Sequence, residues 1–417
     1  MDRIVVRGNG PLRGEVAASG SKNASLALMA SALLARGETR LENVPKLRDV
    51  EAMLEILRAL GAAAEWSSPG VVRIEPGENS DPEAPYDLVR KMRASFLVLG
   101  PLLARYGAAR VSEPGGCAIG VRPVDQHLKG LEALGGKLRL DHGYVEATAP
   151  RLTGAHVAFD LPTVNGTQNV MMAACLARGE TVLENAAREP EVTELAEALF
   201  KMGAEVRGAG SDRIVIRGVE NLRGIRHRVS GDRIEAGTLL AAAIATRGDV
   251  RVRGVDPSAM ESTLEKLREC GARVESDATS VRARMEGPIR AVRVVTAPFP
   301  GYPTDMQAQL MAALTLAEGS SVVTERVFEN RFMHVPELQR MGADIALSGR
   351  SAHVTGVARL MGAPVMATDL RASAGLIVAA LAAEGETVVN RVYHIDRGYE
   401  RIEEKLRGLG ADIRREG

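Results

Sequence analysis

The chain has few cysteines: three among 417 residues. Three thiols cannot form a disulfide framework, and their spacing matches no zinc-binding pattern. Such a sequence suits a reducing compartment, so we expect a cytoplasmic protein. The N-terminal stretch MDRIVVRGNG alternates like a strand and lacks the apolar core of a signal peptide, which agrees with that expectation.

Aromatic residues, an excess of one charge and long apolar runs are also missing. Aromatic residues make up 3% of the chain, too few to favour a surface that stacks on bases. Lys+Arg and Asp+Glu number 53 each, so no net charge draws the chain to nucleic acid or membrane. The longest apolar stretches, such as 373–383, are far shorter than the roughly 20 residues that span a bilayer. We therefore expect no nucleic-acid or membrane partner.

One pattern recurs six times: a helix of small residues, a glycine, a short strand, an amphipathic helix, and then Gly-Ala or Gly-Gly. The copies lie about 70 residues apart, a longer period than the roughly 20 to 50 residues typical of solenoids. We expect a compact supersecondary unit that is copied six times and divided three and three between two similar domains. The leading glycines are Gly37, Gly107, Gly179, Gly248, Gly319 and Gly385.

Within a copy, the residue pattern predicts which helix is buried all round and which has one apolar face. In the first copy, Val50, Met53, Leu54 and Leu57 share one helical face. The helix upstream, ASLALMASALLA, is apolar nearly all round and belongs in a core. These upstream helices begin after polar turns, where free N–H groups attract anions. Several of the turns add a cation: Lys22, Arg93, Arg233 and Arg371.

The second copy is longer than the others and carries a cysteine. Its two glycines, Gly107 and Gly135, are 28 residues apart, against 23 to 25 in the other copies, and the excess lies in EPGGCAIGVRP. Cys117 in this stretch is either a small neutral residue at a tolerant position or an accessible thiol that gives a proton or forms an adduct. Cys175 and Cys270 lie in predicted helices, where a packing role is expected.

Distinctive motifs run from one end of the chain to the other: GSKNA (20–24), MRAS (92–95), GGCAIGVRPVD (115–125), ENAAREPE (184–191), GDRIEAGT (231–238), PTDMQAQ (303–309), FENRFMHVPEL (328–338), ATDLRASA (367–374) and YHIDRGYERIEEKLR (393–407). Taken together, these motifs resemble those of the enolpyruvyl transferases, specifically members that act on UDP-N-acetylglucosamine. The resemblance covers the whole chain, and the combination of motifs is highly specific.

The resemblance implies an α/β fold, α+β by some schemes, with two inside-out barrel-like domains. Each domain would hold three βαβαββ units, and the active site would lie in the cleft between the domains. The first domain would comprise residues 22–229 and carry the Cys117 loop. Residues 1–21 and 230–417 would form the second domain.

The implied reaction transfers the enolpyruvyl group of phosphoenolpyruvate to the 3-hydroxyl of UDP-N-acetylglucosamine and releases phosphate. It proceeds through a tetrahedral ketal and is the first committed step of peptidoglycan synthesis. The resemblance implies these two substrates as partners and no metal or organic cofactor.

The resemblance also implies roles for individual residues. Cys117 would be the general acid; in relatives the corresponding cysteine forms an adduct with phosphoenolpyruvate and is alkylated by the epoxide antibiotic fosfomycin. Asp305 would take the proton of the sugar hydroxyl, and Asp369 would position groups or relay protons. Cations suit phosphoenolpyruvate because it is a small anion. Lys22, Arg122 and Arg397 would hold its phosphate and carboxylate, and the rest of the basic cleft would be Arg93, Arg331 and Arg371.

A further set of residues is assigned by resemblance to the sugar nucleotide. Asn23 would contact it directly, and Val327 would do so beside Phe328. The uracil would lie near Arg122, Pro123, Val124, Asp125, Gln126, Thr163 and Val164.

Several alternatives stay open at this point. Asp305 and Asp369, each at a predicted helix start, are also consistent with simple N-caps. Asn165 stands where relatives often have glycine, and Leu97 where some have a bulky aromatic residue, so Leu97 is not assigned to the site.

Three other functions compete with this interpretation. A shikimate-pathway enolpyruvyl transferase would share the fold and reaction but lack the cysteine loop. A silent paralogue that binds UDP-sugar would be expected to lose Cys117, Asp305 or Arg397, and all three are present. A purely structural repeat protein would not explain why one copy alone has grown a cysteine loop.

Overall fold

The computed structural model describes residues 2–78, 83–90, 92–113 and 124–417. The chain divides into two compact units. Among the described residues, unit 1 holds 2–19 and 231–417, and unit 2 holds the described part of 20–230. The chain passes from one unit to the other between Ser19 and Gly20 and again between Ser230 and Gly231.

The elements of unit 2, in chain order, are α1 (Lys22–Ser31), η1 (Ala32–Leu34), β3 (Ala35–Arg36), β4 (Thr39–Glu42), α2 (Arg48–Ala59), β5 (Ala63–Ser68), β6 (Val71–Glu75), β7 (Glu83–Ala84), α3 (Tyr86–Val89), η2 (Arg93–Val98), α4 (Leu99–Tyr106), β8 (Ala108–Ser112), α5 (Asp125–Ala133), β9 (Lys137–Asp141), β10 (Tyr144–Thr148), β11 (His156–Ala158), α6 (Val164–Ala174), β12 (Glu180–Glu184), α7 (Pro190–Met202), β13 (Glu205–Arg207), β14 (Arg213–Arg217), β15 (Leu222–Arg223) and β16 (Arg226–Arg228).

The elements of unit 1 are β1 (Arg3–Arg7), β2 (Arg13–Ala17), α8 (Arg233–Ala245), β17 (Asp249–Arg253), η3 (Pro257–Met260), α9 (Glu261–Glu269), β18 (Arg273–Ser276), β19 (Ser280–Arg284), β20 (Ile289–Arg290), β21 (Arg293–Val295), η4 (Thr304–Met306), α10 (Gln307–Leu314), β22 (Ala317–Glu318), β23 (Ser320–Thr324), α11 (Val335–Arg340), β24 (Asp344–Ser348), β25 (Ser351–Thr355), β26 (Pro364–Met366), α12 (Leu370–Ala382), β27 (Glu386–Asn390), η5 (Val392–Arg397), α13 (Ile402–Gly408) and β28 (Asp412–Glu416).

The six predicted copies appear as six four-stranded sheets among the described residues, three in each unit. In each sheet an outer strand pairs in parallel with an inner one, and the other two pairings are antiparallel, as in the order β11-β12-β14-β13. The parallel strands β11 and β12 are joined through α6, and α7 leads from β12 to the β13–β14 hairpin. This element order is βαβαββ, so the predicted α/β class and its repeating unit are confirmed.

The N-terminal strands pair with strands that are distant in the sequence. β1 lies between β27 and β28, with Val5 opposite Val388 on one side and Arg414 on the other. β2 pairs in parallel with β17 in the first sheet of unit 1. The segment that precedes the first copy therefore completes two sheets of unit 1.

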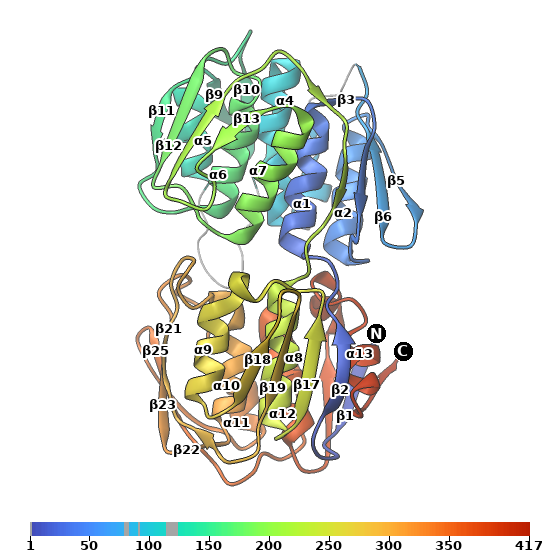
Figure 1. Cartoon of the computed structure of the whole chain (residues 1–417), viewed down its shortest axis with the longest axis vertical. Coiled ribbons are helices and arrows are strands. Elements are labelled where there is room, and N and C mark those ends of the chain that lie inside the picture. The colour runs from blue at the N-terminus through green and yellow to red at the C-terminus, as the bar shows by residue number, and fades with distance from the viewer. Residues whose placement is uncertain (1, 79–82, 91, 114–123) are drawn as a thin grey trace. The chain divides into compact units, whose positions relative to one another are not determined.

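The helices of small residues form the centre of each unit, as their composition predicts. In unit 1, α8, α10 and α12 pack against one another and have strands around them in Figure 1. Close approach needs small residues: a Cβ added at Gly375 in α12 would lie 2.8 Å from the carbonyl oxygen of Ala308 in α10. In unit 2, α4 packs on α6 and η2 packs on α1. By contrast, α2 buries the single face predicted for it, including Val50, Met53, Leu54 and Leu57.

Polar side chains begin several of these central helices. Ser21 caps α1, Thr163 caps α6, Asp232 caps α8 and Asp369 caps α12, each by accepting a hydrogen bond from a backbone N–H of the first turn. The caps fix where each helix begins, and candidate site residues follow them directly.

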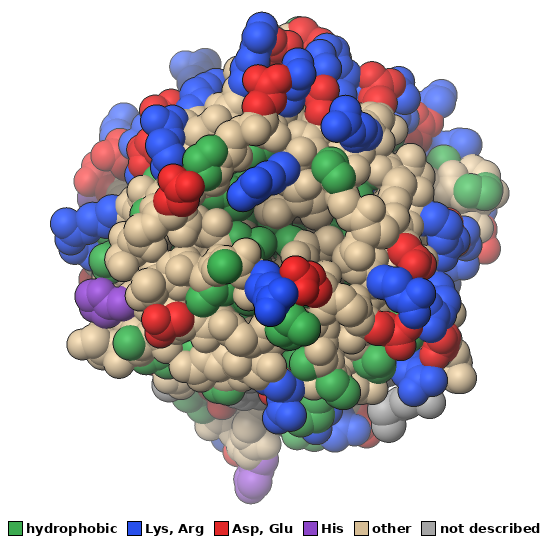
Figure 2. All heavy atoms as spheres, turned by 90° about the horizontal axis from the view of Figure 1, so that it is seen from below, with side chains coloured by type: hydrophobic (Ala, Val, Ile, Leu, Met, Phe, Trp, Pro, Cys, Tyr) green, Lys and Arg blue, Asp and Glu red, His purple; other side chains and the backbone are tan. Residues whose placement is uncertain are grey.

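Charges of both signs are mixed on the surface. Figure 2 shows Lys and Arg side chains next to Asp and Glu side chains on the face it draws. The chain has exposed ion pairs, such as Arg253 with Glu15 at 2.7 Å, and pairs of this kind contribute little to stability. Within the described ranges, no helix is both long enough and apolar enough to cross a membrane.

Candidate functional site

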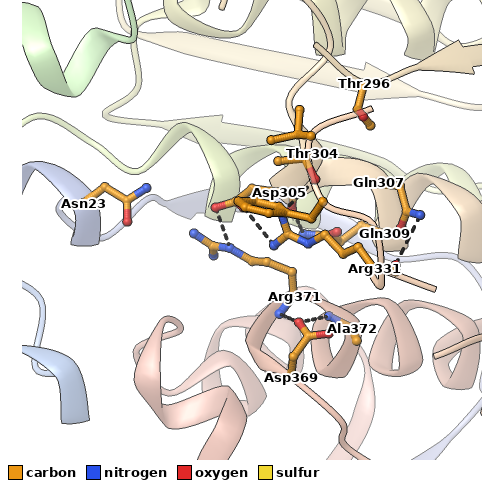
Figure 3. A network of polar contacts seen from close by, with 12 residues as sticks. Asn23, Thr296, Thr304, Asp305, Gln307, Gln309, Arg331, Asp369, Arg371 and Ala372 are labelled. Carbon is orange, nitrogen blue, oxygen red and sulfur yellow. Dashed lines mark hydrogen bonds and ion pairs between the residues drawn. The ribbon is translucent and has the colours of Figure 1, made fainter. Parts of the chain in front are cut away.

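The carboxylate of Asp305 is held by two buried arginines of unit 1 (Figure 3). Arg331 Nη2 lies 2.8 Å from Asp305 Oδ1, and Arg371 Nε lies 3.2 Å from Asp305 Oδ2. The arginines are 6% and 2% exposed. The side chain of Asp305 is 27% exposed. It is therefore an accessible carboxylate with a cation beside each oxygen.

Asp305 is not an N-cap in the structure. Asp305 lies inside η4, and neither η4 nor α10 has a side-chain cap hydrogen bond. Asp369, in contrast, is the N-cap of α12: its Oδ1 accepts hydrogen bonds from Arg371 N at 2.8 Å and Ala372 N at 3.0 Å. Asp369 thus fixes the helix start that carries Arg371, while the side chain of Asp305 is turned to the arginines.

Arg371 is packed into a polar network at the centre of unit 1. Its guanidinium carbon lies 5.3 Å from the centre of the Tyr399 ring. The Tyr399 hydroxyl lies 2.9 Å from Thr238 Oγ1 and accepts from Gln309 Nε2 at 3.1 Å. Gln309 Nε2 also donates to the backbone oxygen of Asp305 at 2.8 Å. The network therefore links the central helices α8, α10 and α12 to the turn that carries Asp305.

The guanidinium of Arg371 is kept charged. Burial by itself lowers the pKa of Arg371, but the interactions with Tyr399 and Asp305 outweigh burial and raise the pKa above the usual value for arginine. Burial raises the pKa of the Tyr399 phenol, which stays protonated at neutral pH. Nη1 of Arg371 is buried and has no hydrogen-bond partner in the part of the chain that the structure describes. An anionic oxygen of a ligand would satisfy this N–H group.

Two histidines near Asp369 are neutral at pH 7. Burial lowers the pKa of His334 to about 4, although Asp369 opposes this. Burial and then Arg397 lower the pKa of His394. The positive charge around Asp305 therefore comes from arginines and not from these imidazoles.

Arg397 is the last residue of η5, and the segment that carries it is held by the C-terminal strand. Arg415 in β28 reaches Asp396, the residue before Arg397, with Nη2–Oδ1 at 2.6 Å and Nη1–Oδ2 at 3.2 Å. Arg415 Nε also donates to Glu403 at 2.8 Å. This bidentate contact fixes the backbone next to Arg397.

In unit 2, the predicted residues Lys22 and Asn23 lie in the first turn of α1. Lys22 Nζ lies 2.8 Å from Asp49 Oδ2, and the side chains are 12% and 3% exposed. Asn23 Nδ2 donates to Glu191 Oε1 at 3.3 Å. Both side chains are held by carboxylates of neighbouring helices, α2 and α7.

The residues predicted to lie near the uracil are brought together in part. Gln126 in α5 donates to Asp160 Oδ2 at 3.0 Å and accepts from Asp160 N at 2.9 Å. Asp160 lies three residues before Thr163, whose hydroxyl caps α6 by accepting from Gly166 N at 3.3 Å. Val124 and Asp125 begin α5, and Val164 is the first residue of α6. α5 and α6 pack together, which places these two segments side by side.

The remaining predicted residues are placed as follows. Arg93 begins η2, and Val327 lies in the half-buried loop after β23. Leu97 is 1% exposed and belongs to the core of unit 2, in line with its omission from the site. Cys117, Arg122 and Pro123 lie outside the described residues.

Sequence reasoning missed Thr238, Gln309 and Tyr399, although each lies within a quoted motif. A signal was available for two of them: Thr238 and Gln309 are polar residues in helices that were predicted to be buried all round, and buried polar groups need partners. Within the described ranges, no group of three or more His, Cys, Asp or Glu side chains is arranged to hold a metal ion.

Comparison with known proteins gives full-length relatives. The family model described as EPSP synthase (3-phosphoshikimate 1-carboxyvinyltransferase) matches residues 6–406. Two curated proteins named UDP-N-acetylglucosamine 1-carboxyvinyltransferase, from Myxococcus xanthus and an Anaeromyxobacter species, are 58% and 60% identical, and in both cases 100% of each chain is covered.

Solved structures show the same fold. The enolpyruvyl transferase NikO from Streptomyces tendae matches with a TM-score of 0.89 and 29% identity over 99% of this chain and 98% of its own. An EPSP synthase from Acinetobacter baumannii matches over 100% of both chains with a TM-score of 0.78 and 18% identity, a likeness of fold alone.

Proposed function

Because the chain belongs to the enolpyruvyl transferase family, we propose that it is a UDP-N-acetylglucosamine 1-carboxyvinyltransferase. It transfers the enolpyruvyl group of phosphoenolpyruvate to the 3-hydroxyl of UDP-N-acetylglucosamine and releases phosphate. This reaction is the first committed step of peptidoglycan synthesis. The observation that carries the choice of acceptor is the full-length likeness to curated proteins of this name. With three cysteines in 417 residues, a reducing compartment is suitable, and we place the enzyme in the cytoplasm.

The reaction requires an addition followed by an elimination. The sugar oxygen bonds to C2 of phosphoenolpyruvate while its proton leaves and another proton adds to the methylene carbon. The resulting ketal then loses phosphate and one proton of the new methyl group, which restores the carbon–carbon double bond and forms the enol ether product. We assign the proton from the sugar hydroxyl to Asp305 and the proton to the methylene carbon to Cys117.

The arginines beside Asp305 support this assignment. The two guanidinium groups that contact Asp305 are cations of the kind that bind anionic groups of phosphoenolpyruvate, so the proposed base and the binding site for this substrate lie side by side. The unpartnered Nη1 of Arg371 is suited to such a contact with the substrate carboxylate.

The other cations complete the proposal. Lys22, Arg122 and Arg397 bind the phosphate and carboxylate of phosphoenolpyruvate, and Arg93 and Arg331 add positive charge. Asn23 and Val327 bind the sugar nucleotide, with the uracil near residues 122–126 and 163–164. Asp369 holds the start of α12 and thereby the backbone of Arg371.

The test is phosphate release from phosphoenolpyruvate with UDP-N-acetylglucosamine, run beside shikimate 3-phosphate as the alternative acceptor. Release with the UDP-sugar alone is expected. Release with the shikimate acceptor alone would keep the reaction but change the substrate. No release with either acceptor, from protein shown to be folded by circular dichroism, would favour a binding paralogue without activity.

A further inference from the structure

Glu325 is a buried carboxylate that ties together three separate segments of unit 1. It directly follows β23 and is 1% exposed. Its Oε1 accepts from Thr296 Oγ1 at 2.6 Å, Val327 N at 2.7 Å and Phe328 N at 3.1 Å. Its Oε2 accepts from Thr304 Oγ1 at 2.7 Å. A buried carboxylate is costly unless hydrogen bonds satisfy it, and here four donors do so.

The bond from Thr304 fixes the direction of a second bond. A hydroxyl has one proton to donate, and Thr304 donates it to Glu325. The Thr304 oxygen is then left as an acceptor, and Arg331 Nη1 donates to it at 2.9 Å. The other terminal nitrogen of Arg331, Nη2, lies 2.8 Å from Asp305 Oδ1. Figure 3 shows Thr304, Arg331 and Asp305 in this arrangement.

A second chain of contacts leaves Glu325 on the other side. Thr296 also donates its proton to Glu325, and its oxygen accepts from Arg326 N at 2.9 Å. Together with the bonds from Val327 N and Phe328 N, this contact shapes the loop that carries Val327. Glu325 therefore has two arms: one through Thr304 to Asp305, and one through Thr296 to the loop.

We propose that Glu325 is a positioning residue for Asp305 and acts through Thr304 and Arg331. The inference rests on the proposed function, in which Asp305 accepts the proton of the sugar hydroxyl. The carboxylate sets the orientation of the Thr304 hydroxyl, the hydroxyl sets the guanidinium of Arg331, and the guanidinium sets the Asp305 oxygen. A carboxylate is needed because Oε2 must accept from Thr304.

The geometry makes an asymmetric prediction for Glu325→Gln. Three donors converge on Oε1, so the amide oxygen of the glutamine takes that place and the amide nitrogen takes the place of Oε2. The nitrogen cannot accept the Thr304 proton, so the hydroxyl must turn and the lone pair that accepts from Arg331 Nη1 is reoriented. The hydrogen bonds that lead through Thr304 to Asp305 are disturbed, whereas those that lead through Thr296 to the loop are kept.

The experiment compares Glu325→Gln, Thr304→Val, Thr304→Ser and Thr296→Val in the full chain. Thr304→Val and Thr296→Val are matched, since each removes one hydroxyl that donates to the same carboxylate. kcat and KM for UDP-N-acetylglucosamine are measured by phosphate release, and thermal unfolding reports on the fold. Glu325→Gln and Thr304→Val are expected to lower kcat roughly tenfold to a hundredfold, because small misplacements of reacting groups have effects of this size. Their KM for the sugar nucleotide is expected to stay within about threefold of the wild type.

The two controls make the outcome specific. Thr304→Ser keeps the hydroxyl and is expected to retain kcat, and Thr296→Val is expected to change KM more than kcat. Combining Glu325→Gln with Thr304→Val should lower kcat no further than either alone, because both break one arm.

Three results would overturn the inference. The first is a kcat for Thr304→Val equal to that of Thr304→Ser. The second is a loss of kcat in Thr296→Val equal to that in Thr304→Val. Thr296 is 0% exposed, so if these hydroxyls only stabilised the fold, removing the one on Thr296 would lower activity at least as much. The third is multiplicative loss in the double variant. A wild-type protein without turnover would instead overturn the proposed function, and this inference with it.

Discussion

Replacing Lys405 by methionine removes the ammonium group from a buried ion pair of unit 1. The partner is Glu235 in α8, which is 1% exposed. Lys405 Nζ lies 2.8 Å from each oxygen of Glu235, and Ser19 N donates to Oε2 at 2.6 Å. Lys405 Nζ also donates to Ser19 Oγ at 2.7 Å. Methionine keeps most of the apolar stem, so the change isolates the charge.

The expected loss is large because the carboxylate is left buried without this cation. Removing one partner of a buried pair costs about 3–5 kcal/mol. The Lys405 side chain is 18% exposed, so solvent screens part of the interaction, and we expect a loss of unfolding free energy near the lower end, about 3 kcal/mol. The pair between Lys266 and Glu269 serves as control: the lysine is similarly exposed, at 22%, but the carboxylate is 40% exposed and stays solvated. Lys266→Met should therefore cost less than about 1 kcal/mol.

The loss should depend on pH in a defined direction. Burial raises the pKa of Glu235, and Lys405 opposes this rise. Removing Lys405 therefore raises the folded-state pKa further above the unfolded value. A carboxyl group of this kind destabilises the fold while it is ionised, and folding takes up a proton as the pH falls. The loss of unfolding free energy in Lys405→Met is thus largest above the folded-state pKa of Glu235. It shrinks as the pH falls toward 4.5, the ordinary pKa of a glutamate.

Urea unfolding followed by circular dichroism at pH 8 and pH 5 measures this loss. The single tryptophan, Trp66, lies in unit 2, so its fluorescence reports on local unfolding there. The double variant Lys405→Met with Glu235→Gln should recover more than half of the loss, because no charge is then left buried. A loss below about 1 kcal/mol that is the same at both pH values would refute the reasoning.

Three further predictions concern the proposed chemistry and the pH dependence of the fold. Asp305→Asn cannot accept the sugar proton, so kcat in the phosphate-release assay should fall about 10²- to 10⁴-fold; undiminished turnover would exclude Asp305 as the base. Cys117→Asp should keep turnover and, by mass spectrometry, resist alkylation by fosfomycin, whereas Cys117→Ala should lose turnover; full activity of the alanine variant would argue against an acid role. Burial lowers the pKa of His127 from its ordinary value of 6.5 to about 3. Below pH 6.5 this histidine is therefore protonated in the unfolded chain but not in the folded chain. Lowering the pH from 8 to 5.5 should remove about 1.4 kcal/mol of unfolding free energy through this group. His127→Asn should abolish that part of the pH dependence when unfolding is followed by Trp66 fluorescence, and an unchanged pH dependence would contradict the assignment.

The α/β fold class and its repeating unit could be predicted from the sequence because each copy of the repeat has the same local residue patterns. The one-sided apolar pattern of α2 and the all-round apolar pattern of α1 depend on residues within a few positions of each other. Their burial in the structure follows these patterns, including that of Val50 and Met53 on α2. The same local signals predicted the polar turns before the central helices, and Ser21, Thr163, Asp232 and Asp369 are caps at those places.

The candidate site was predictable as a set of residues but not as an arrangement. The motifs named Asp305, Arg331 and Arg371, yet the local pattern around Asp305 was also consistent with an N-cap. The contact that separates these alternatives joins residues 66 positions apart, Arg371 and Asp305. Tyr399 was missed for the same reason, since its hydroxyl meets Thr238, which is 161 positions away.

The sequence by itself determined the six repeats, the helices that are buried and the polar turns that begin them. Periodicity and capping depend on near neighbours, and their signals survive without the rest of the fold. Only the tertiary structure decided that β1 lies between β27 and β28 and that Glu325 faces both Thr296 and Thr304. These contacts depend on how helices and loops distant in sequence pack together. The direction of each hydrogen bond there is set by the partners that packing supplies, because a buried hydroxyl has one proton to give.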